Sequence, residues 1–562
     1  MTVEAPNLQS GARRVVDVLE RKGVETVFGL PGVHNLALWD SLSRSEIRLI
    51  GVRHEQTAVY AADGFARTTG HVGVALVTTG PGAANALAAT GEAMASGSPV
   101  VVIATDIPSH LRSPDVTRGV LHECADQEAM FAPLVKSGTT TSTAGDVAAN
   151  VASACNAALR APSGPVYVGI PTDFLAARAE TPERDAGESP PVPLPTDRDL
   201  DLAADLLTAA ARPLIIAGGG AVRADAGEGI ARLAEGIAAP VVTTYAGKGI
   251  LPVKHRCHAP WTLHAPQVGA LWDEADLVLA IGTDLDGTTT QNWALPEPPE
   301  LVTINVDPRD AAKNYTPRLA LVGDAEEVTR RLLARLPSGA DTGRVRARIS
   351  AIEDELRNQI AAEDAEAGAL IDAVADVVGE GIPVIADMCI PGYWLAGYLP
   401  VGSPRTFAYP MGWGTLGFAF PASVGAALGG APRTVSICGD GGFLYACGEL
   451  ATVAQERLPV TVVVVDDGGY GMLRFDQTMA GREPFGVDLL TPDFVALAGS
   501  FGILTAAVDG FGPEFRQRLH DLCAADGPNL LLVRAGLRPP LNTSPRWYRH
   551  AADLCEEEDG AS

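Results

Sequence analysis

Short runs of β-branched residues alternate with alanine-rich helical patterns along almost the whole chain. These runs show little polar alternation, so each predicted strand must bury both of its faces. Such strands form parallel sheets that helices cover on both sides, because each crossover between parallel strands needs a long connection. The pattern therefore predicts an α/β chain of doubly wound parallel sheets. The clearest runs are Val74–Thr78, Pro99–Ala104, Pro213–Ala217, Leu277–Ile281, Thr434–Cys438 and Val460–Val465.

Two segments with linker composition divide the chain into three parts. The first, Ala176–Leu200, contains a proline-rich, charged run that suits neither a helix nor a strand ladder. The second begins at Leu336 and leads into the pattern Arg344–Gln359, whose apolar spacing predicts a connector helix on the surface. At about 150 residues per domain, a chain of this length holds three or four domains. We predict domains at residues 1–178, 198–336 and 360–545.

The charge and cysteine patterns exclude several classes of function. The chain carries 42 Lys and Arg against 68 Asp and Glu, a net charge of −26, which disfavours binding to nucleic acid or to an anionic membrane. No apolar run approaches the roughly 20 residues of a membrane span, and Met1–Ser10 lacks the pattern of an export signal. The eight cysteines form no CxxC pair, so the sequence indicates neither a disulfide framework nor a zinc site. We expect a cytoplasmic protein without nucleic-acid or membrane partners.

One predicted strand–helix–strand unit brings acidic residues together. The turn Gly439-Asp440-Gly441-Gly442 follows a strand and begins a helix predicted over Phe443–Gln455, which leads into the strand Thr461–Val465. Crossovers between parallel strands are right-handed, so the two strands lie side by side. Asp440 and the run Asp466–Gly469 therefore meet at the carboxyl edge of the sheet.

This combination of residues suits a metal ion and a diphosphate. The glycines let a bound group approach the backbone, and the amides at a helix start favour an anion. Carboxylate oxygens suit Mg²⁺ that bridges to a diphosphate. An isolated Gly-Asp-Gly would more simply be a tight turn with Asp440 as the helix cap. The acidic run after the next strand favours the metal and diphosphate site instead.

Gly439-Asp440-Gly441, followed by Asp467 within Asp-Asp-Gly-Gly-Tyr-Gly, resembles the thiamin diphosphate motif of the acetolactate synthase and pyruvate decarboxylase superfamily. The resemblance covers nearly the whole chain and implies pyrimidine-binding, middle and diphosphate-binding domains, in that order. It implies that Asp440, Asp467 and the carbonyl of Gly469 bind Mg²⁺, although this chain has Asp467 where the family usually has Asn. The other implied cofactor contacts of this motif are Gly439, Gly441, Gly442, Tyr470, Gly471 and Met472.

The segment Arg53-His54-Glu55-Gln56 resembles the family segment that carries a catalytic glutamate. Considered alone, Glu55 would be a first-turn helix residue that the helix dipole stabilises. The resemblance implies that its carboxyl binds the pyrimidine N1′ and favours the imino tautomer, which removes the thiazolium C2 proton.

Further resemblances complete the expected cofactor site. Pro410–Phe418 resembles the stretch in which the carbonyl of Gly414 accepts from the 4′-amino group and Leu416 wedges between the two rings. Gly80–Asn85 resembles another loop near the cofactor. The resemblance also implies a homodimer or homotetramer whose active sites are shared between subunits.

The middle part contains Gly218-Gly219-Gly220 but no full GxGxxG, so a nucleotide site is only weakly indicated. Relatives that bind FAD usually have an arginine-containing loop where this chain has Ile281–Gly287. We therefore interpret the middle domain as a scaffold and regard FAD as unlikely.

Members of this family decarboxylate a 2-oxo acid and differ in what happens to the carbon that has lost CO₂. Aldehyde-releasing members protonate it with an Asp, a tandem His pair and a Glu. At the matching positions this chain has Val33, His122-Glu123 and Leu473, so one of four proton-handling groups is present. Scarce proton donors favour carboligation, in which the carbon attacks a second carbonyl compound. We predict His122 as a catalytic proton donor or carboxylate-orienting group.

Two alternatives stay open. Phe28–His34 and Leu121–Glu123 look like segments of decarboxylases that release aldehydes from amino-acid-derived 2-oxo acids. A regulatory subunit that retains the fold without catalysis is the non-enzyme alternative, and its best support is Asp467. Against it, Glu55, Gly414, Leu416 and Asp440 are all present.

Overall fold

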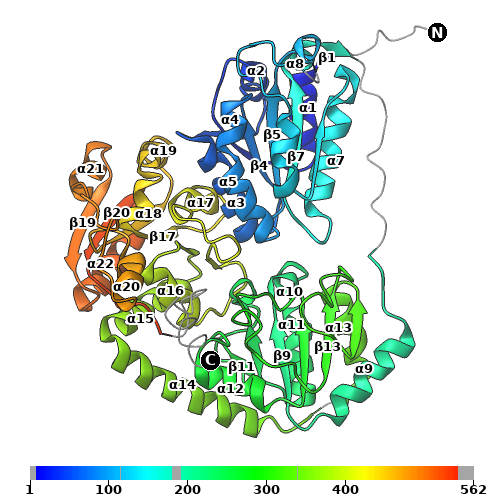
Figure 1. Ribbon diagram of the computed structural model, residues 1–562, viewed down its shortest axis with the longest axis vertical. Coiled ribbons are helices and arrows are strands. Elements are labelled where there is room, and N and C mark those ends of the chain that lie inside the picture. Colours follow the sequence, from blue (N-terminus) through cyan, green and yellow to red (C-terminus); the bar gives the residue numbers. More distant parts are fainter. Residues whose placement is uncertain (1–7, 114–115, 180–191, 338, 542–562) are drawn as a thin grey trace, which may run out of the picture.

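The computed structural model describes residues 8–113, 116–179, 192–337 and 339–541. Within these residues, three parallel sheets of six strands each form three α/β lobes, which Figure 1 shows with helices packed around every sheet. The predicted fold of three doubly wound parallel-sheet domains is confirmed. The small strands β1 (Gln9–Ser10) and β8 (Arg178–Ala179) pair antiparallel beside the first lobe.

The first lobe contains the strand order β3–β2–β4–β5–β7–β6. Its strands are β2 (Thr26–Gly29), β3 (Arg48–Gly51), β4 (Gly73–Val77), β5 (Val100–Asp106), β6 (Ser137–Thr140) and β7 (Val166–Pro171). Its helices are α1 (Gly11–Arg21), α2 (Leu36–Leu42), α3 (Glu55–Thr69), α4 (Pro81–Asn85), α5 (Leu87–Ala95), α6 (Gln127–Phe131), α7 (Val147–Leu159) and α8 (Thr172–Ala176).

The second lobe contains the strand order β11–β10–β9–β12–β13–β14. Its strands are β9 (Pro213–Ala217), β10 (Val241–Thr243), β11 (His258–Ala259), β12 (Leu277–Ile281), β13 (Leu301–Asn305) and β14 (Leu319–Val322). Its helices are α9 (Asp197–Ala209), α10 (Gly219–Arg223), α11 (Gly227–Ile237), α12 (Pro266–Glu274) and α13 (Ala325–Leu333).

The third lobe contains the strand order β16–β15–β17–β18–β20–β19. Its strands are β15 (Val384–Ala386), β16 (Phe407–Ala408), β17 (Thr434–Gly439), β18 (Val460–Asp466), β19 (Leu504–Asp509) and β20 (Asn529–Arg534). Its helices are α15 (Ala365–Gly379), α16 (Ile390–Tyr398), α17 (Ala419–Ala426), α18 (Asp440–Leu444), α19 (Leu450–Glu456), α20 (Gly471–Met479), α21 (Phe494–Ser500) and α22 (Pro513–Ala524).

The third sheet shares a hydrophobic core with each of its neighbours. Val464 of β18 packs in the same core as Val77 of the first sheet, whereas Val463 packs in the same core as Ile216 of the second. Successive strand residues point to opposite faces, so both faces of the third sheet are covered. Helix α14 (Gly343–Glu363), the predicted connector, runs beneath the second and third lobes and buries Ile352 in the second of these cores (Figure 1).

The first and third lobes meet where α3 packs against α17. A Cβ at Gly64 of α3 would collide with the carbonyl of Ala422, and a Cβ at Gly425 of α17 would collide with the carbonyl of Ala61. Glycine at both positions lets the two helices approach closely, which no larger residue would permit. This contact fixes the first lobe against the third.

The helix predicted over Phe443–Gln455 is interrupted in the structure. It forms α18, the short 3₁₀ turn Cys447–Glu449 and α19, with Ala446 at a non-helical φ of −136°. The interruption places the buried carboxylate of Glu449 against the first lobe, where it accepts a hydrogen bond from the Arg53 amide at 2.9 Å. The long-range contact outweighs local helix propensity here.

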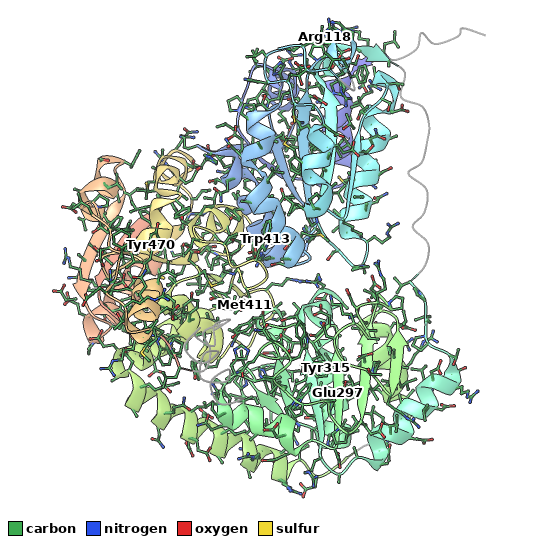
Figure 2. All side chains as sticks on the ribbon, viewed as in Figure 1. Arg118, Glu297, Tyr315, Met411, Trp413 and Tyr470 are labelled. Carbon is green, nitrogen blue, oxygen red and sulfur yellow. The ribbon has the colours of Figure 1, made fainter. Side chains whose placement is uncertain are left out.

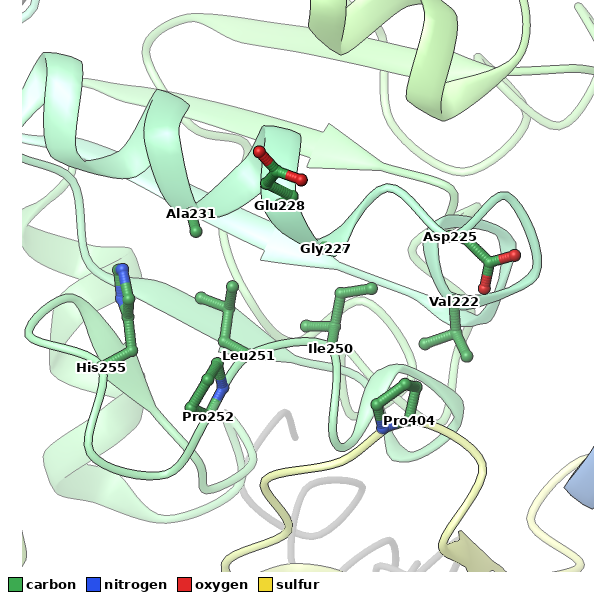
Figure 3. Close-up of a pocket in the computed structure, with 10 residues that line it drawn as sticks. All are labelled: Val222, Asp225, Gly227, Glu228, Ala231, Ile250, Leu251, Pro252, His255 and Pro404. Carbon is green, nitrogen blue, oxygen red and sulfur yellow. The ribbon is translucent and has the colours of Figure 1, made fainter.

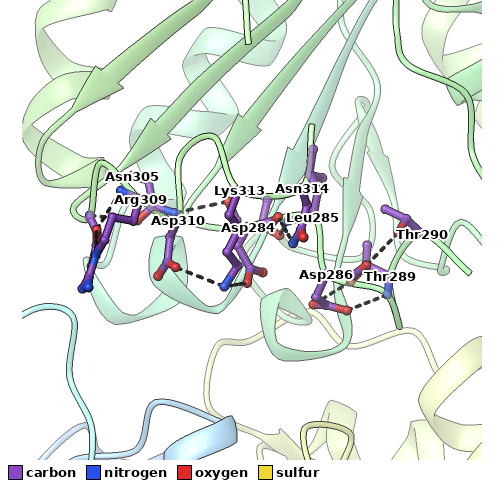
Figure 4. A network of polar contacts seen from close by, with 12 residues as sticks. Asp284, Leu285, Asp286, Thr289, Thr290, Asn305, Arg309, Asp310, Lys313 and Asn314 are labelled. Carbon is purple, nitrogen blue, oxygen red and sulfur yellow. Dashed lines mark hydrogen bonds and ion pairs between the residues drawn. The ribbon is translucent and has the colours of Figure 1, made fainter. Parts of the chain in front are cut away.

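The glycines of the second lobe pack against the protein's own backbone. A Cβ at Gly218 or Gly220 would lie within 3 Å of the Gly282 backbone. The loop after β12 is held by polar contacts with the segment after β13, among them an ion pair of 2.5 Å between Lys313 Nζ and Asp284 Oδ2 (Figure 4). Close packing of loops therefore accounts for the glycine run.

In the part of the chain that the structure describes, no helix combines the length and the apolar character that crossing a membrane requires. The seven cysteines within the described residues are free thiols. The cytoplasmic location stays a prediction.

Lys248 joins the second and third lobes from a buried position. Its Nζ donates to the carbonyls of Pro260 at 3.3 Å and Leu399 at 3.0 Å, and no carboxylate pairs with it among the described residues. Burial lowers the pKa of Lys248 to about 7.

We expect this buried amine to make stability depend on pH. Between pH 7 and about 10.4, the ordinary lysine pKa, the unfolded chain holds the proton more tightly, so stability rises with pH. Each unit of pKa depression corresponds to about 1.4 kcal/mol. Thermal melts of Lys248→Met should lack this rise, whereas melts of the exposed control Lys254→Met should keep it. Parallel pH profiles for Lys248→Met and the parent would contradict this prediction.

Candidate active site

Asp440 lies at the carboxyl edge of the third sheet, beside Asp467. Strands β17 and β18 are parallel neighbours in which Gly439 pairs with Val465, so the residues that follow each strand emerge together. The Asp440 side chain is buried, its residue being 1% exposed, and its Oδ1 accepts from the Gly441 amide at 2.7 Å. Its Oδ2 is buried and has no hydrogen-bond partner. A buried carboxylate oxygen without a partner is costly unless it binds a ligand.

The electrostatics of this edge also fit a cation. Burial, together with the nearby charges of Asp467 and Asp466, raises the pKa of Asp440 to about 7. Burial likewise raises the pKa of Asp467, although Arg474 opposes the shift. Among the described residues, no three His, Cys, Asp or Glu side chains form a metal cluster. A cation here would therefore take two side-chain carboxylates and complete its shell from the backbone, a phosphate and water.

The loop after β18 has a conformation that requires glycine. Gly468 and Gly469 have φ of +79° and +148°, and a Cβ at Gly471 would collide with Asp467 Oδ2. Arg474 of α20 donates to the carbonyls of Asp467 at 3.2 Å and Gly468 at 3.1 Å. Arg474 therefore holds the loop, a role that the sequence did not reveal. Tyr470 packs over Gly441, and Met472 is partly buried against the core beneath.

Asp387 holds the loop of Gly414 and lies beside the turn of Asp440. Its carboxylate accepts from the amides of Gly417 at 3.0 Å and Phe418 at 3.3 Å, and a Cβ at Gly442 would lie 2.7 Å from its Oδ2. Burial raises the pKa of Asp387 to about 6, against the effect of these hydrogen bonds. Leu416 is only partly buried. No sequence motif pointed to Asp387.

Glu92 of α5 holds the same loop from the first lobe. Its Oε2 accepts from the Trp413 amide at 3.3 Å and the Thr415 hydroxyl at 3.2 Å. Arg67 forms ion pairs with Glu92 at 3.1 Å and with Asp63 at 2.7 Å. Figure 2 shows Trp413 at the junction of the two lobes and Tyr470 within the third.

Glu55 begins α3 directly after β3 and is 6% exposed. Its Oε2 accepts from Asn85 Nδ2 at 3.0 Å, and a Cβ at Gly82 would lie 3.2 Å from its Oε1. Within the described residues, no hydrogen bond or ion pair links Glu55 to Asp440 or to the loop of Gly414. The predicted site residues therefore form two groups, one on the third sheet and one on the first.

His122 belongs to the group on the first sheet. It is partly buried, has a φ of +64° and packs against Gly80 through its carbonyl. Glu123, its neighbour, accepts from two backbone amides of its own loop. Val33 and Leu473, which stand where aldehyde-releasing members have an Asp and a Glu, are 62% and 51% exposed.

A cavity of about 430 Å³ opens in the second lobe beside Pro404, lined by residues such as Ile250 and Leu251 (Figure 3). None of the predicted site residues lines it. The cavity is therefore separate from both groups.

Residues 9–130, 200–332 and 388–533 match, in turn, the N-terminal TPP binding, central and C-terminal TPP binding domains of the thiamine pyrophosphate enzyme family. The chain belongs to this family. The prediction of a thiamin diphosphate-dependent enzyme is confirmed.

The curated relatives carry two kinds of name. A probable 2-ketoarginine decarboxylase of Pseudomonas aeruginosa is 37% identical over 88% of each chain. A probable acetolactate synthase large subunit of Methanocaldococcus jannaschii is 30% identical over 93% of this chain and 91% of its own. The acetolactate synthase large subunit of Corynebacterium glutamicum is 31% identical over 90% of this chain and 83% of its own.

Proposed function

We propose that the protein decarboxylates a 2-oxo acid and joins the remaining carbon to a second carbonyl compound, with thiamin diphosphate and Mg²⁺ as cofactors. The unpartnered, buried Oδ2 of Asp440 beside Asp467 is the observation that supports the metal and cofactor site, and the relatives named acetolactate synthase support carboligation. When bound, thiamin diphosphate supplies an acceptor for the electrons that CO₂ leaves behind. Because Gly218 and Gly220 pack against the Gly282 backbone, we expect no FAD.

Each predicted residue then has a role. Asp440, Asp467 and the Gly469 carbonyl hold the metal, and Glu55 holds the proton exchanged at the pyrimidine N1′. The Gly414 carbonyl would accept from the 4′-amino group, and Leu416 would lie between the two rings. The remaining backbone at Gly439, Gly441, Gly442, Tyr470, Gly471 and Met472 would surround the diphosphate.

Release of an aldehyde is the second candidate outcome. It is favoured by the relative named as a decarboxylase and by a second imidazole, His34, which lies 3.3 Å from His122. A panel of 2-oxo acids, including 2-ketoarginine and pyruvate, with and without an aldehyde acceptor, separates the outcomes by mass spectrometry. Carboligation predicts a 2-hydroxy ketone or acetolactate-type acid as the major product at saturating acceptor. Almost exclusive release of aldehyde would replace carboligation by the second candidate, and no CO₂ from any acid would favour a regulatory subunit.

We further propose a homodimer or homotetramer with shared active sites. The absence of polar contacts between Glu55 and the Asp440 group within the described residues of one chain supports this arrangement. Mixing Glu55→Gln with Asp440→Asn subunits should then restore activity to about a quarter of the parent, because half of the randomly formed dimers hold one intact site. Each variant alone serves as the control. Mixtures that stay as inactive as either variant would contradict shared sites.

A further inference from the structure

The carboxylate of Glu449 reaches from the third lobe to the turn that carries Glu55. Glu449 is 1% exposed and ends the short 3₁₀ turn before α19. Its two oxygens accept from the Arg53 amide at 2.9 and 3.2 Å, and the Thr57 hydroxyl is a further hydrogen-bond partner. Arg53 and Thr57 lie two residues before and two residues after Glu55. One buried carboxylate therefore spans the turn where β3 ends and α3 begins.

The groups around this carboxylate hold it in one position. Thr452 Oγ1 donates to Glu449 Oε2 at 2.5 Å. The Arg53 side chain donates to the Gly51 carbonyl at 2.8 Å and to Gln455 Oε1 of α19 at 2.9 Å. Hydrogen bonds to a charged group are about twice as strong as neutral ones, and a buried carboxylate is costly without them. These contacts therefore fix the β3–α3 turn against α19.

The position of the Glu55 carboxyl depends on this turn. Asn85 Nδ2 of the first lobe donates to Glu55 Oε2 at 3.0 Å, which orients the carboxyl group. The backbone from which the side chain extends begins α3 directly after the turn, with His54 as the helix cap. Proton transfer needs donor and acceptor within about 3 Å, and a displacement of about 1 Å can cost about 10²-fold in rate. A shift of the turn would therefore change the reactivity of Glu55.

Glu449 lies nine residues after Asp440, so a role in the metal group is the alternative to be weighed. Helix α18, which begins at Asp440, ends at Leu444, and the non-helical Ala446 separates it from Glu449. In the described part of the chain, the hydrogen bonds of the Glu449 carboxylate go to the β3–α3 turn and to Thr452. The contacts therefore connect Glu449 with Glu55 and not with the metal group.

A second acid of α19 crosses the same interface without reaching the turn. Glu456 Oε2 forms an ion pair of 3.1 Å with Arg48, the first residue of β3. The turn that carries Glu55 follows the other end of this strand. Glu456 therefore offers a matched control, because it has the same charge and joins the same two lobes.

We propose that Glu449 is a positioning residue, which fixes the β3–α3 turn so that the carboxyl of Glu55 meets the pyrimidine N1′ of the cofactor. This inference rests on the proposed function, in which Glu55 exchanges a proton with that ring. Glu449 and Glu55 belong to one chain, whereas the proposed shared site takes its metal group from the other subunit. Each subunit therefore positions its own glutamate.

Variants of Glu449 separate position from charge. In Glu449→Ala, deuterium exchange at the thiazolium C2 should slow by more than tenfold and up to about 10²-fold. Glu449→Gln can still accept from the Arg53 amide and should stay within about threefold of the parent. Affinity for thiamin diphosphate with Mg²⁺ should stay within about tenfold in both, because the metal group is unchanged. The control Glu456→Ala should exchange at the parent rate. If Glu449→Ala does not fold, Glu449→Asp, which withdraws the carboxylate by one methylene, takes its place.

Amide hydrogen exchange of the cofactor-free protein, followed by mass spectrometry, reports on the turn itself. The Arg53 amide and the first turn of α3 should lose protection in Glu449→Ala and keep it in Glu449→Gln and Glu456→Ala. Peptides from β18, an interior strand of the third sheet, should exchange as in the parent. This pattern would show that the loss is local and does not reflect general destabilisation.

Mixed subunits assign Glu449 to one half of the shared site. Glu449→Ala mixed with Asp440→Asn should restore activity to about a quarter of the parent, because half of the randomly formed dimers hold one intact site. Glu449→Ala mixed with Glu55→Gln should restore nothing beyond the activity of Glu449→Ala alone, because both changes affect the same half. The opposite pattern would place Glu449 in the metal group and overturn the proposal.

Three further results would overturn it: C2 exchange at the parent rate in Glu449→Ala, unchanged protection of the Arg53 amide, or a Glu449→Gln enzyme as slow as Glu449→Ala. A Glu55→Gln enzyme that exchanges C2 at the parent rate would instead overturn the proposed function on which the inference rests.

Discussion

The Glu55→Gln enzyme should turn over its 2-oxo acid about 10²-fold or more slowly than the parent, the usual scale for losing a positioned acid–base group. Glutamine keeps the size of the side chain and can still accept from Asn85 Nδ2, so cofactor affinity should stay within about tenfold. What it loses is a proton that can be exchanged with the pyrimidine ring.

Deuterium exchange at the thiazolium C2, followed by nuclear magnetic resonance, measures this step directly. Exchange should slow in Glu55→Gln and remain at the parent rate in the control Glu46→Gln, whose side chain is exposed. If Glu55→Gln exchanges as fast as the parent, Glu55 has no part in the proton transfer.

Asp440→Asn should abolish tight binding of thiamin diphosphate. Loss of an outer-shell partner of a metal site already costs about 10–100-fold in affinity, so loss of a direct carboxylate ligand should cost more than about 100-fold. In the parent, cofactor should bind only with a divalent metal, because Asp440, Asp467 and the diphosphate repel one another without it.

Calorimetry with Mg²⁺ and with a chelator tests both statements. Asp467→Asn is the matched control, since it introduces the amide that the family usually has and should retain binding within about tenfold. Equal affinity of the parent with and without metal would contradict the assignment of the site. Loss of binding in Asp467→Asn alone would show that the acid at this position is essential.

The interlobe contacts explain how the loop of Gly414 is positioned. Glu92 and the Arg67–Asp63 pair hold the loop of Gly414 from the first lobe, while Asp387 holds it from the third. The loop is therefore fixed from both sides before a cofactor binds. Such preorganisation lowers the entropy lost on binding.

The sequence by itself determined the three parallel sheets and the meeting of Asp440 with Asp467. Both follow from local rules: buried strands are recognisable by composition, and one right-handed crossover brings the ends of β17 and β18 together. The roles of the glycines at 439, 441, 442, 469 and 471 came instead from the resemblance to the family, and they stay predictions.

Only the tertiary structure decided which side chains support these loops. Asp387, Arg474 and Glu92 hold backbone amides or carbonyls, and neither type of contact leaves a pattern in the sequence around them. The break before α19 likewise places Glu449 against a strand nearly 400 residues earlier in the chain. His34 and His122 are 88 residues apart and contact each other only because β2 and β5 lie in one sheet. Contacts between distant segments depend on how the lobes pack, which local periodicity and spacing do not specify.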